Sequence, residues 1–142
     1  MTSFRFTPNK GSSTKGRLVL TGVLADSGWA DVDPRVDDVN IGVRTGANTA
    51  CCTVDSASWQ KTFPAHFGFW DQQRSVCPPI ACMSLVVRRS GSAGFKITAP
   101  GVELTEEMLK DIQLGFVIDG HCSAGSLSLT NLRRKGRALV YP

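Results

Sequence analysis

Residues 112–118, Ile-Gln-Leu-Gly-Phe-Val-Ile, place an apolar side chain at every second position. Successive side chains of a strand point to opposite faces of a sheet, so this alternation predicts a strand with one buried face. Residues 39–43, Val-Asn-Ile-Gly-Val, show the same alternation earlier in the chain. The pair Asp-Gly at 119–120 is typical of a hairpin turn. The sequence therefore predicts a fold built on antiparallel strands.

Short apolar runs separated by turn residues continue along most of the chain. They predict further strands at or near residues 17–24, 50–54, 67–70, 83–88, 95–99, 127–129 and 139–141. Residues 105–110 alone resemble a helix, because Thr105 can cap a first turn that carries two glutamates. About nine short strands with one short helix predict an all-β protein, specifically an antiparallel β-sandwich.

The chain has 142 residues, which is the length of one domain. Its composition, 42% hydrophobic and 20% charged, is that of a folded globular protein and not of a disordered chain. Residues 1–16 are largely polar, so we expect a flexible N-terminal segment there and a single β-sandwich domain over residues 17–142. No apolar run approaches the roughly 18–20 residues that a membrane span needs, so no membrane span is expected.

The two alternating stretches resemble each other. Residues 38–46 and 111–120 each combine an Asp, alternating apolar side chains and a central glycine. This similarity predicts a two-fold internal repeat, with its two halves forming the two layers of the sandwich. Gly42 and Gly115, inside the strands, would then mark bulges or points of close backbone approach.

The chain contains five cysteines, an odd number, so at least one thiol has no partner within the chain. A local bridge between Cys77 and Cys82 would close the loop that contains Pro78 and Pro79. A second bridge would join Cys51 or Cys52 to Cys122, because these cysteines follow the two copies of the repeated pattern. The spacings do not match a zinc site, so no metal is expected.

Several motifs occur in an order that resembles a known group of proteins. They are Asp33-Pro34 and the stretches 37–43, 67–71, 83–87, 94–97 and 101–104. Over Arg17 to Leu129 the chain resembles β-sandwich modules of exported or lipid-anchored proteins of environmental bacteria. The resemblance implies a sandwich fold and export. It implies no site, because that group has no established chemistry.

The resemblance and the cysteines favour an extracellular or cell-surface location. A cytoplasmic location is the alternative, because residues 1–17 contain no signal peptide. No nucleophile-elbow or phosphate-loop motif is present, and neighbouring His121 and Cys122 would point to opposite faces of a strand. We therefore expect a non-enzymatic binding or structural module without a cofactor, in which exposed strand edges leave homodimerisation open.

Aromatic rings provide the candidate ligand site. Trp29, Trp59 and Trp70 lie in the first half of the chain, and exposed amphipathic rings are good stacking platforms. Trp29 lies in a polar loop and is expected to be the most exposed of the three. The hypothesis is a carbohydrate or small-ligand module, with a glycan or a protein as its partner. The alternative is that the rings pack in the core.

The net charge of +4 comes from one segment, residues 133–137. Its cations are Arg133, Arg134, Lys135 and Arg137. Such a cluster can bind phosphates by releasing counterions, so an alternative function is an intracellular orphan protein of the mobile gene pool that contacts nucleic acid. The simpler interpretation is a charged hairpin that protects a sheet edge. Residues 26–38, with five aspartates around Arg35, form an acidic stretch that is either a solvated loop or a calcium site.

Overall fold

The structure is a computed structural model. It describes residues 3–12, 14–24, 27–45, 48–105, 108, 112–118, 121–127 and 133–141. Within these residues the backbone forms twelve strands and two short 3-10 turns, η1 (Ser27–Asp31) and η2 (Ser56–Ser58). Every strand pair is antiparallel. The predicted all-β, antiparallel class is confirmed, and the strands outnumber the nine expected.

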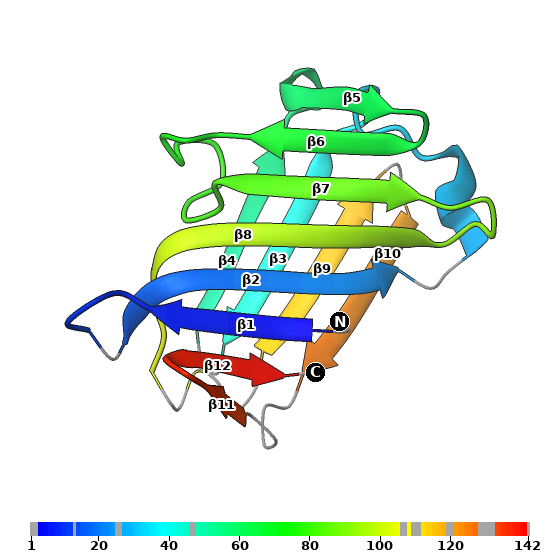
Figure 1. Cartoon of the computed structure of the whole chain (residues 1–142). Coiled ribbons are helices and arrows are strands. Elements are labelled where there is room, and N and C mark those ends of the chain that lie inside the picture. The colour runs from blue at the N-terminus through cyan, green and yellow to red at the C-terminus, as the bar shows by residue number, and fades with distance from the viewer. Residues whose placement is uncertain are drawn as a thin grey trace.

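Eight strands form the larger sheet, in the order β11-β12-β1-β2-β8-β7-β6-β5 (Figure 1). Their bounds are β1 (Ser3–Pro8), β2 (Lys15–Leu24), β5 (Trp59–Phe63), β6 (His66–Trp70), β7 (Cys82–Val87), β8 (Ala93–Glu103), β11 (Arg133–Lys135) and β12 (Ala138–Tyr141). The two longest strands, β2 and β8, pair along the middle of this sheet, with one register shift between Gly16 and Leu18.

Four strands form the smaller sheet, in the order β10-β9-β3-β4. They are β3 (Val39–Thr45), β4 (Asn48–Val54), β9 (Ile112–Ile118) and β10 (His121–Leu127). This sheet lies behind the larger one in Figure 1, and its strands run across the strands of the larger sheet. Its two central strands, β3 and β9, are the two alternating stretches of the sequence.

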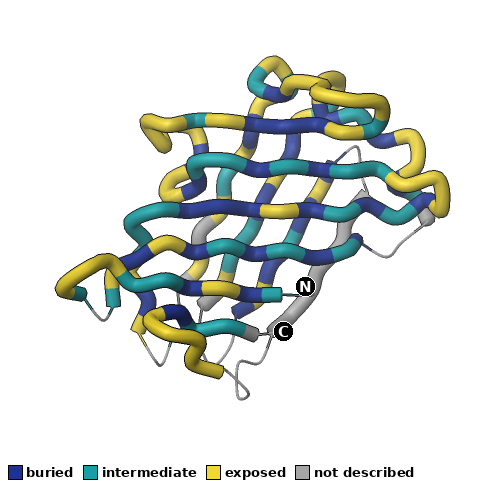
Figure 2. Tube along the Cα trace, in the orientation of Figure 1, coloured by how far each residue is buried: buried dark blue, intermediate teal, exposed yellow. Residues whose placement is uncertain are grey.

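The inward side chains of both sheets belong to one hydrophobic cluster. Phe4 and Leu20 enter it from the larger sheet, and Ile41 enters it from the smaller sheet. The rings of Phe95 on β8 and Phe116 on β9 lie 4.8 Å apart, centroid to centroid, across the two sheets. Figure 2 shows burial alternating along the central strands, as the two-residue period of a strand requires. This alternation is why the sequence pattern identified those strands.

The N-terminal residues differ from the expectation of a flexible segment over residues 1–16. Residues 3–8 form β1, which pairs with both β2 and β12. Phe4 and Phe6 are 0% and 1% exposed, so they anchor this strand in the core. Their alternation spans only two apolar positions among polar neighbours, and it was too short to predict a strand.

The repeated stretches lie side by side in the smaller sheet and not in opposite layers. Gly42 pairs with Gly115 in a continuous register, so neither glycine marks a bulge. A Cβ on Gly115 would have no heavy atom within 4 Å, and one on Gly42 would meet only the Cys51 sulfur, at 3.8 Å. The expected close backbone approach at these glycines is therefore wrong.

The predicted helix at 105–110 lies mostly outside the described residues. Of its two described residues, Met108 donates its backbone N–H to the Thr105 hydroxyl at 3.3 Å. Across the described part of the chain, no helix has the length and apolar character that crossing a membrane requires.

Candidate functional site

A cavity of about 250 Å³ lies between the two sheets, because residues of both sheets line it. The larger sheet contributes positions on β2 and β8, and the smaller sheet contributes positions on β3, β4 and β9. Two connecting segments complete the wall, through residues 77–80 before β7 and through Leu104 and Met108 after β8. The lining residues are Leu18, Leu20, Ile41, Val43, Thr49, Cys51, Cys52, Cys77, Pro78, Pro79, Ile80, Ile97, Ala99, Val102, Glu103, Leu104, Met108 and Ile112.

The walls of this pocket are apolar because they are the inward faces of the strands. Leu20, Ile97 and Ile112 are each no more than 2% exposed. Ala99 also lies inward, and its short side chain leaves space that a larger residue would fill. The lining therefore offers an apolar ligand extensive contact and few hydrogen-bond partners.

The polar groups of the pocket lie among its exposed residues. Thr49 and Glu103 are both exposed, and Glu103 is the single ionisable acid or base among the lining residues apart from the cysteines. Among the lining residues that the structure describes there is no Lys, Arg or His. A ligand carboxylate would consequently find no opposite charge among the described lining residues, and Glu103 itself pairs in register with Lys15 of β2.

A disulfide fixes one side of the pocket. Cys52 on β4 is bonded to Cys77, with their Cα atoms 5.4 Å apart. Both predicted pairings are therefore wrong, since Cys51 and Cys82 are free thiols. The side chain of Cys122 lies outside the part of the chain that can be described.

Strand alternation explains this pairing. Cys52 pairs in register with buried Ile41, so it points between the sheets, whereas Cys51 pairs with Gly42 and points outward. Cys82 pairs with Trp70 and Thr98 on the outward side of the larger sheet. Cys52 can therefore reach Cys77, whereas Cys82 points away from the pocket.

The segment that carries Cys77 is a hydrogen-bonded loop between β6 and β7. The Asp71 carboxylate accepts hydrogen bonds from the backbone N–H groups of Val76 at 2.9 Å and Arg74 at 3.0 Å. These bonds, led by the one from Val76, hold the pKa of Asp71 below its usual range. At the end of the loop, the Ala81 N–H donates to the Thr98 carbonyl at 2.9 Å. The loop is thus fixed to β8 beside the pocket.

The three tryptophans do not form one site. Trp29, expected to be the most exposed, is 0% exposed, and its backbone N–H donates to the Gly91 carbonyl at 3.1 Å. The short turn η1 thereby directs the ring into the core, which makes that expectation wrong. Trp59 is 5% exposed and packs against Phe69, with ring centroids 6.0 Å apart. Trp70 alone of the three is exposed, at 55%, and none of them lines the pocket.

The basic segment forms the edge hairpin of the larger sheet. Arg133, Arg134 and Lys135 make up β11, which pairs with β12, and Arg137 lies in the turn that joins them. All four cations are exposed. The charged hairpin at a sheet edge is confirmed, and contact with nucleic acid stays a prediction.

The acidic stretch uses its carboxylates within the fold. Asp33 and Arg35 form an ion pair at 2.6 Å, and the hydrogen bonds from Arg35 lower the pKa of Asp33. Asp38 accepts the Ser56 N–H at 2.9 Å. Across the residues whose side chains are described, no group of three or more His, Cys, Asp or Glu is placed to hold a metal ion.

The sequence interpretation missed the pocket, because its lining comes from many separate segments. The alternation showed which side chains point inward, and it could not show where the two sheets leave a space. The one local signal is the Cys77-Pro78-Pro79 stretch, for which the sequence predicts a loop closed by a local disulfide and which instead lines the pocket. A search for related proteins gave no match, whether to a protein family, a curated protein or a solved structure.

Proposed function

We propose that this chain is an exported, non-enzymatic β-sandwich that binds a small apolar ligand between its sheets. The observation that carries the proposal is the apolar cavity of about 250 Å³ between β2 and β8 on one side and β3, β4 and β9 on the other. Protein interiors are close-packed and contain few voids larger than a water molecule. A space of this size is therefore better explained by a ligand than by core packing.

The size of the pocket indicates the size of its ligand. An apolar cavity of about 150 Å³ is enough to bind benzene, and pockets for drug-sized ligands start at about 300 Å³. The pocket of about 250 Å³ lies between these limits. It suits a single short aliphatic chain or a small ring system.

The charge of the pocket indicates the ligand's chemical class. Glu103 is exposed, and the described lining residues include no cation. A neutral ligand enters this apolar lining without the desolvation cost that an unpaired carboxylate carries. We therefore expect an aliphatic alcohol to bind more tightly than the fatty acid of the same length.

The disulfide supports an extracellular or cell-surface location. Disulfides persist in oxidising compartments and are rare in cytosolic proteins. The Cys52–Cys77 bond joins the smaller sheet to the loop beside the pocket, so it serves the same site. An extracellular or cell-surface protein is consistent with this bond.

The sandwich and the repeat belong to the same proposal. The shared hydrophobic cluster and the contact between Phe95 and Phe116 support two packed layers. The Gly42–Gly115 pair lies at the centre of the smaller sheet, between the hairpins β3-β4 and β9-β10. This arrangement supports a two-fold relation between these hairpins alone.

The test is displacement of the fluorescent apolar probe 1-aminoanthracene by straight-chain alcohols, from hexanol to dodecanol. Each added CH₂ that enters the pocket should tighten binding about fourfold, which corresponds to about 0.8 kcal/mol. The gain should stop once the pocket is full. Dodecanoate at neutral pH should bind more weakly than dodecanol. Affinity that does not change with chain length would contradict the proposal.

A pair of variants shows whether the probe binds in the pocket. Ala99→Phe places a ring in the pocket, because Ala99 lines it. Val117→Phe is the matched control, because Val117 on β9 is 40% exposed and does not line the pocket. Ala99→Phe should abolish displacement and Val117→Phe should preserve it. Equal binding by both variants would place the probe elsewhere and would contradict the proposed site.

A further inference from the structure

The outward side of the larger sheet carries a second feature, a set of exposed cations. Phe4 and Phe6 of β1 point into the core, so the intervening Arg5 points outward. Arg5 pairs in register with Val19 and Val140, and Val140 pairs with Arg133. Paired residues share a face, so Arg5 and Arg133 belong to the same surface.

The same reasoning assigns the other members of this surface. Lys96 of β8 lies outward because its neighbours Phe95 and Ile97 are buried. Arg17 pairs with Thr7, and Lys135 pairs with Ala138 on the face of Val140. We call this surface the basic face. Its cations are Arg5, Lys15, Arg17, Lys96, Arg133 and Lys135.

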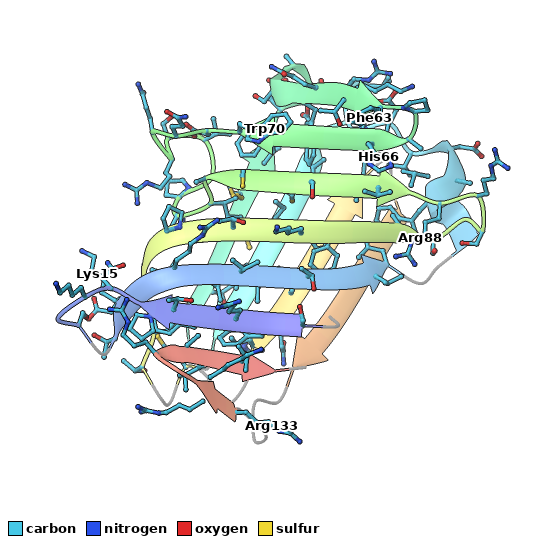
Figure 3. The ribbon with its side chains drawn as sticks, in the orientation of Figure 1. Lys15, Phe63, His66, Trp70, Arg88 and Arg133 are labelled. Atoms are coloured by element: carbon cyan, nitrogen blue, oxygen red, sulfur yellow. A yellow bond between two sulfur atoms is a disulfide. The ribbon has the colours of Figure 1, made fainter. Side chains whose placement is uncertain are left out.

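The basic face is strongly unbalanced in charge. Glu103 is the one acidic residue in the described residues of the eight strands, and it pairs in register with Lys15. The acidic stretch at 26–38 lies outside these strands. Figure 3 shows Lys15 and Arg133 near two margins of the sheet, and Arg88 near a third. The surface is therefore complementary to an extended polyanion.

Exposed aromatic rings occupy the other end of the same face. Trp70 is 55% exposed and Phe63 is 69% exposed. Phe63 contacts His66 edge-on, with ring centroids 6.1 Å apart. Figure 3 shows these three side chains on and beside β6. The Trp70 ring lies over Gly68, in the space that a Cβ there would fill.

One exposed ring, Trp70, lies in the same row across the sheet as Arg5 and Arg133. Trp70 pairs with Cys82, which pairs with Thr98 and then Val19, and Val19 pairs with Arg5. Four strand spacings separate β6 from β1 in the sheet order, which is about 19 Å at roughly 4.8 Å per spacing. A chain lying along this row would meet the Trp70 ring at one end and the cations Arg5 and Arg133 at the other.

We propose that the basic face binds single-stranded nucleic acid, independently of the apolar pocket. Proteins that bind single strands combine a basic surface along the backbone with aromatic rings on which bases stack. A sulfated polysaccharide or an anionic membrane could satisfy the cations. The exposed Trp70 ring in one row with Arg5 and Arg133 fits single strands better, since each base has a π-face and each nucleotide carries one phosphate.

The experiment uses the full, oxidised chain and a fluorescein-labelled oligo(dT) of about 15 nucleotides, followed by anisotropy. Contacts to about three phosphates should give a slope of log affinity against log salt near −2, so that raising salt from 50 to 200 mM weakens binding about 20-fold. Oligo(dT) should also quench Trp70, the exposed tryptophan. Binding that is insensitive to salt would overturn the proposal.

Matched variants distinguish binding at the basic face from a non-specific effect of the net charge of the protein. Arg5→Gln and Lys96→Gln should each reduce the steepness of the salt dependence by about 0.7. Arg44→Gln, on the outward side of the smaller sheet, should leave it unchanged. Trp70→Ala should weaken binding about fivefold or more, through the loss of base stacking. Equal effects of Arg44→Gln and Arg5→Gln would overturn the assignment to the basic face.

Two competitors test the class of partner. Heparin at an equal concentration of charge should compete poorly with oligo(dT), and its binding should not change with Trp70→Ala. Vesicles that contain phosphatidylserine should bind less tightly than oligo(dT) at the same salt. Tighter binding to heparin would overturn the proposal and identify the partner as a polysaccharide. Tighter binding to vesicles would overturn it and identify the partner as a membrane. Loss of the pocket in Ala99→Phe should leave oligo(dT) binding intact.

Discussion

At the scale of single residues, two residues of the same type, both tryptophans, have different environments in the fold. Trp29 is fully buried in the core, and Trp70 is largely exposed on the basic face. The sequence suggested the reverse for Trp29, because its neighbours are small and polar. Burial of that ring depends on where η1 meets Gly91, a contact between segments far apart in the sequence.

This difference predicts different costs of substitution. Trp29→Ala removes a fully buried ring and should lower the free energy of unfolding by about 3–5 kcal/mol. Trp70→Ala should change it by no more than about 0.5 kcal/mol, as an exposed substitution does. Urea denaturation followed by circular dichroism measures both values. Similar losses in the two variants would contradict the burial described.

Asp71 predicts a dependence of stability on pH. Its folded pKa is lowered by backbone hydrogen bonds, so its ionised form stabilises the fold above the unfolded pKa of about 3.9. That contribution is lost as the pH falls through the folded pKa. The difference in unfolding free energy between wild type and Asp71→Asn should be largest near neutral pH and should shrink in acid. A difference that is constant from pH 7 to pH 3 would be inconsistent with this role.

At the scale of elements, the strands whose alternate side chains enter the core were predictable, and two edge strands of the larger sheet were not. Strand β9 matches its predicted bounds, because each alternate side chain enters the core. Strand β5 lies at a sheet edge, and after Trp59 its residues are all exposed, so it shows no apolar alternation. Strand β11 is basic throughout and gives no strand signal. These two edge strands are specified by their neighbours more than by their own sequence.

Substitutions at two outward-facing glycines, Gly115 and Gly68, should have different effects on the free energy of unfolding. Gly115→Val should raise the free energy of unfolding by about 0.5–1 kcal/mol, because the site has open space and β-branched residues favour strands. Gly68→Ala should give no gain, because the Trp70 ring occupies the space above it. Combining Gly68→Ala with Trp70→Ala should remove the conflict. A stabilised Gly68→Ala variant in the presence of Trp70 would contradict the ring position.

The disulfide predicts that loss of the Cys52 sulfur lowers the stability strongly, whereas loss of the neighbouring Cys51 sulfur changes it little. The bond closes a loop with a sequence separation of 25, and the lost loop-closure entropy corresponds to about 3.5 kcal/mol. The double variant Cys52→Ser, Cys77→Ser should lose about that much stability. Cys51→Ser should change stability by no more than about 0.5 kcal/mol, because Cys51 is exposed and unbridged. Equal losses of stability in the double variant and in Cys51→Ser would indicate a different disulfide pairing.

At the scale of the whole molecule, the sequence predicted the β class and not the arrangement of the sheets. Strands β3 and β9 were recognised as similar, yet their pairing in one sheet depends on contacts across the chain. The pocket depends on still more, since its walls combine five strands and two connecting segments. Such a space depends on how the two sheets lie relative to each other, which no local pattern encodes. The basic face likewise gathers Arg5, Lys96 and Arg133 from distant segments.

The central claim is that the space between the sheets is a ligand site. The most direct measurement is methyl NMR of the protein with decanol, which detects intermolecular contacts through nuclear Overhauser effects. The account predicts contacts from the decanol chain to the methyl groups of Ile41, Ile97 and Ile112, which line the pocket, and none to exposed Val117. Contacts to Val117 without contacts to the three isoleucines, or no contacts at all, would contradict it.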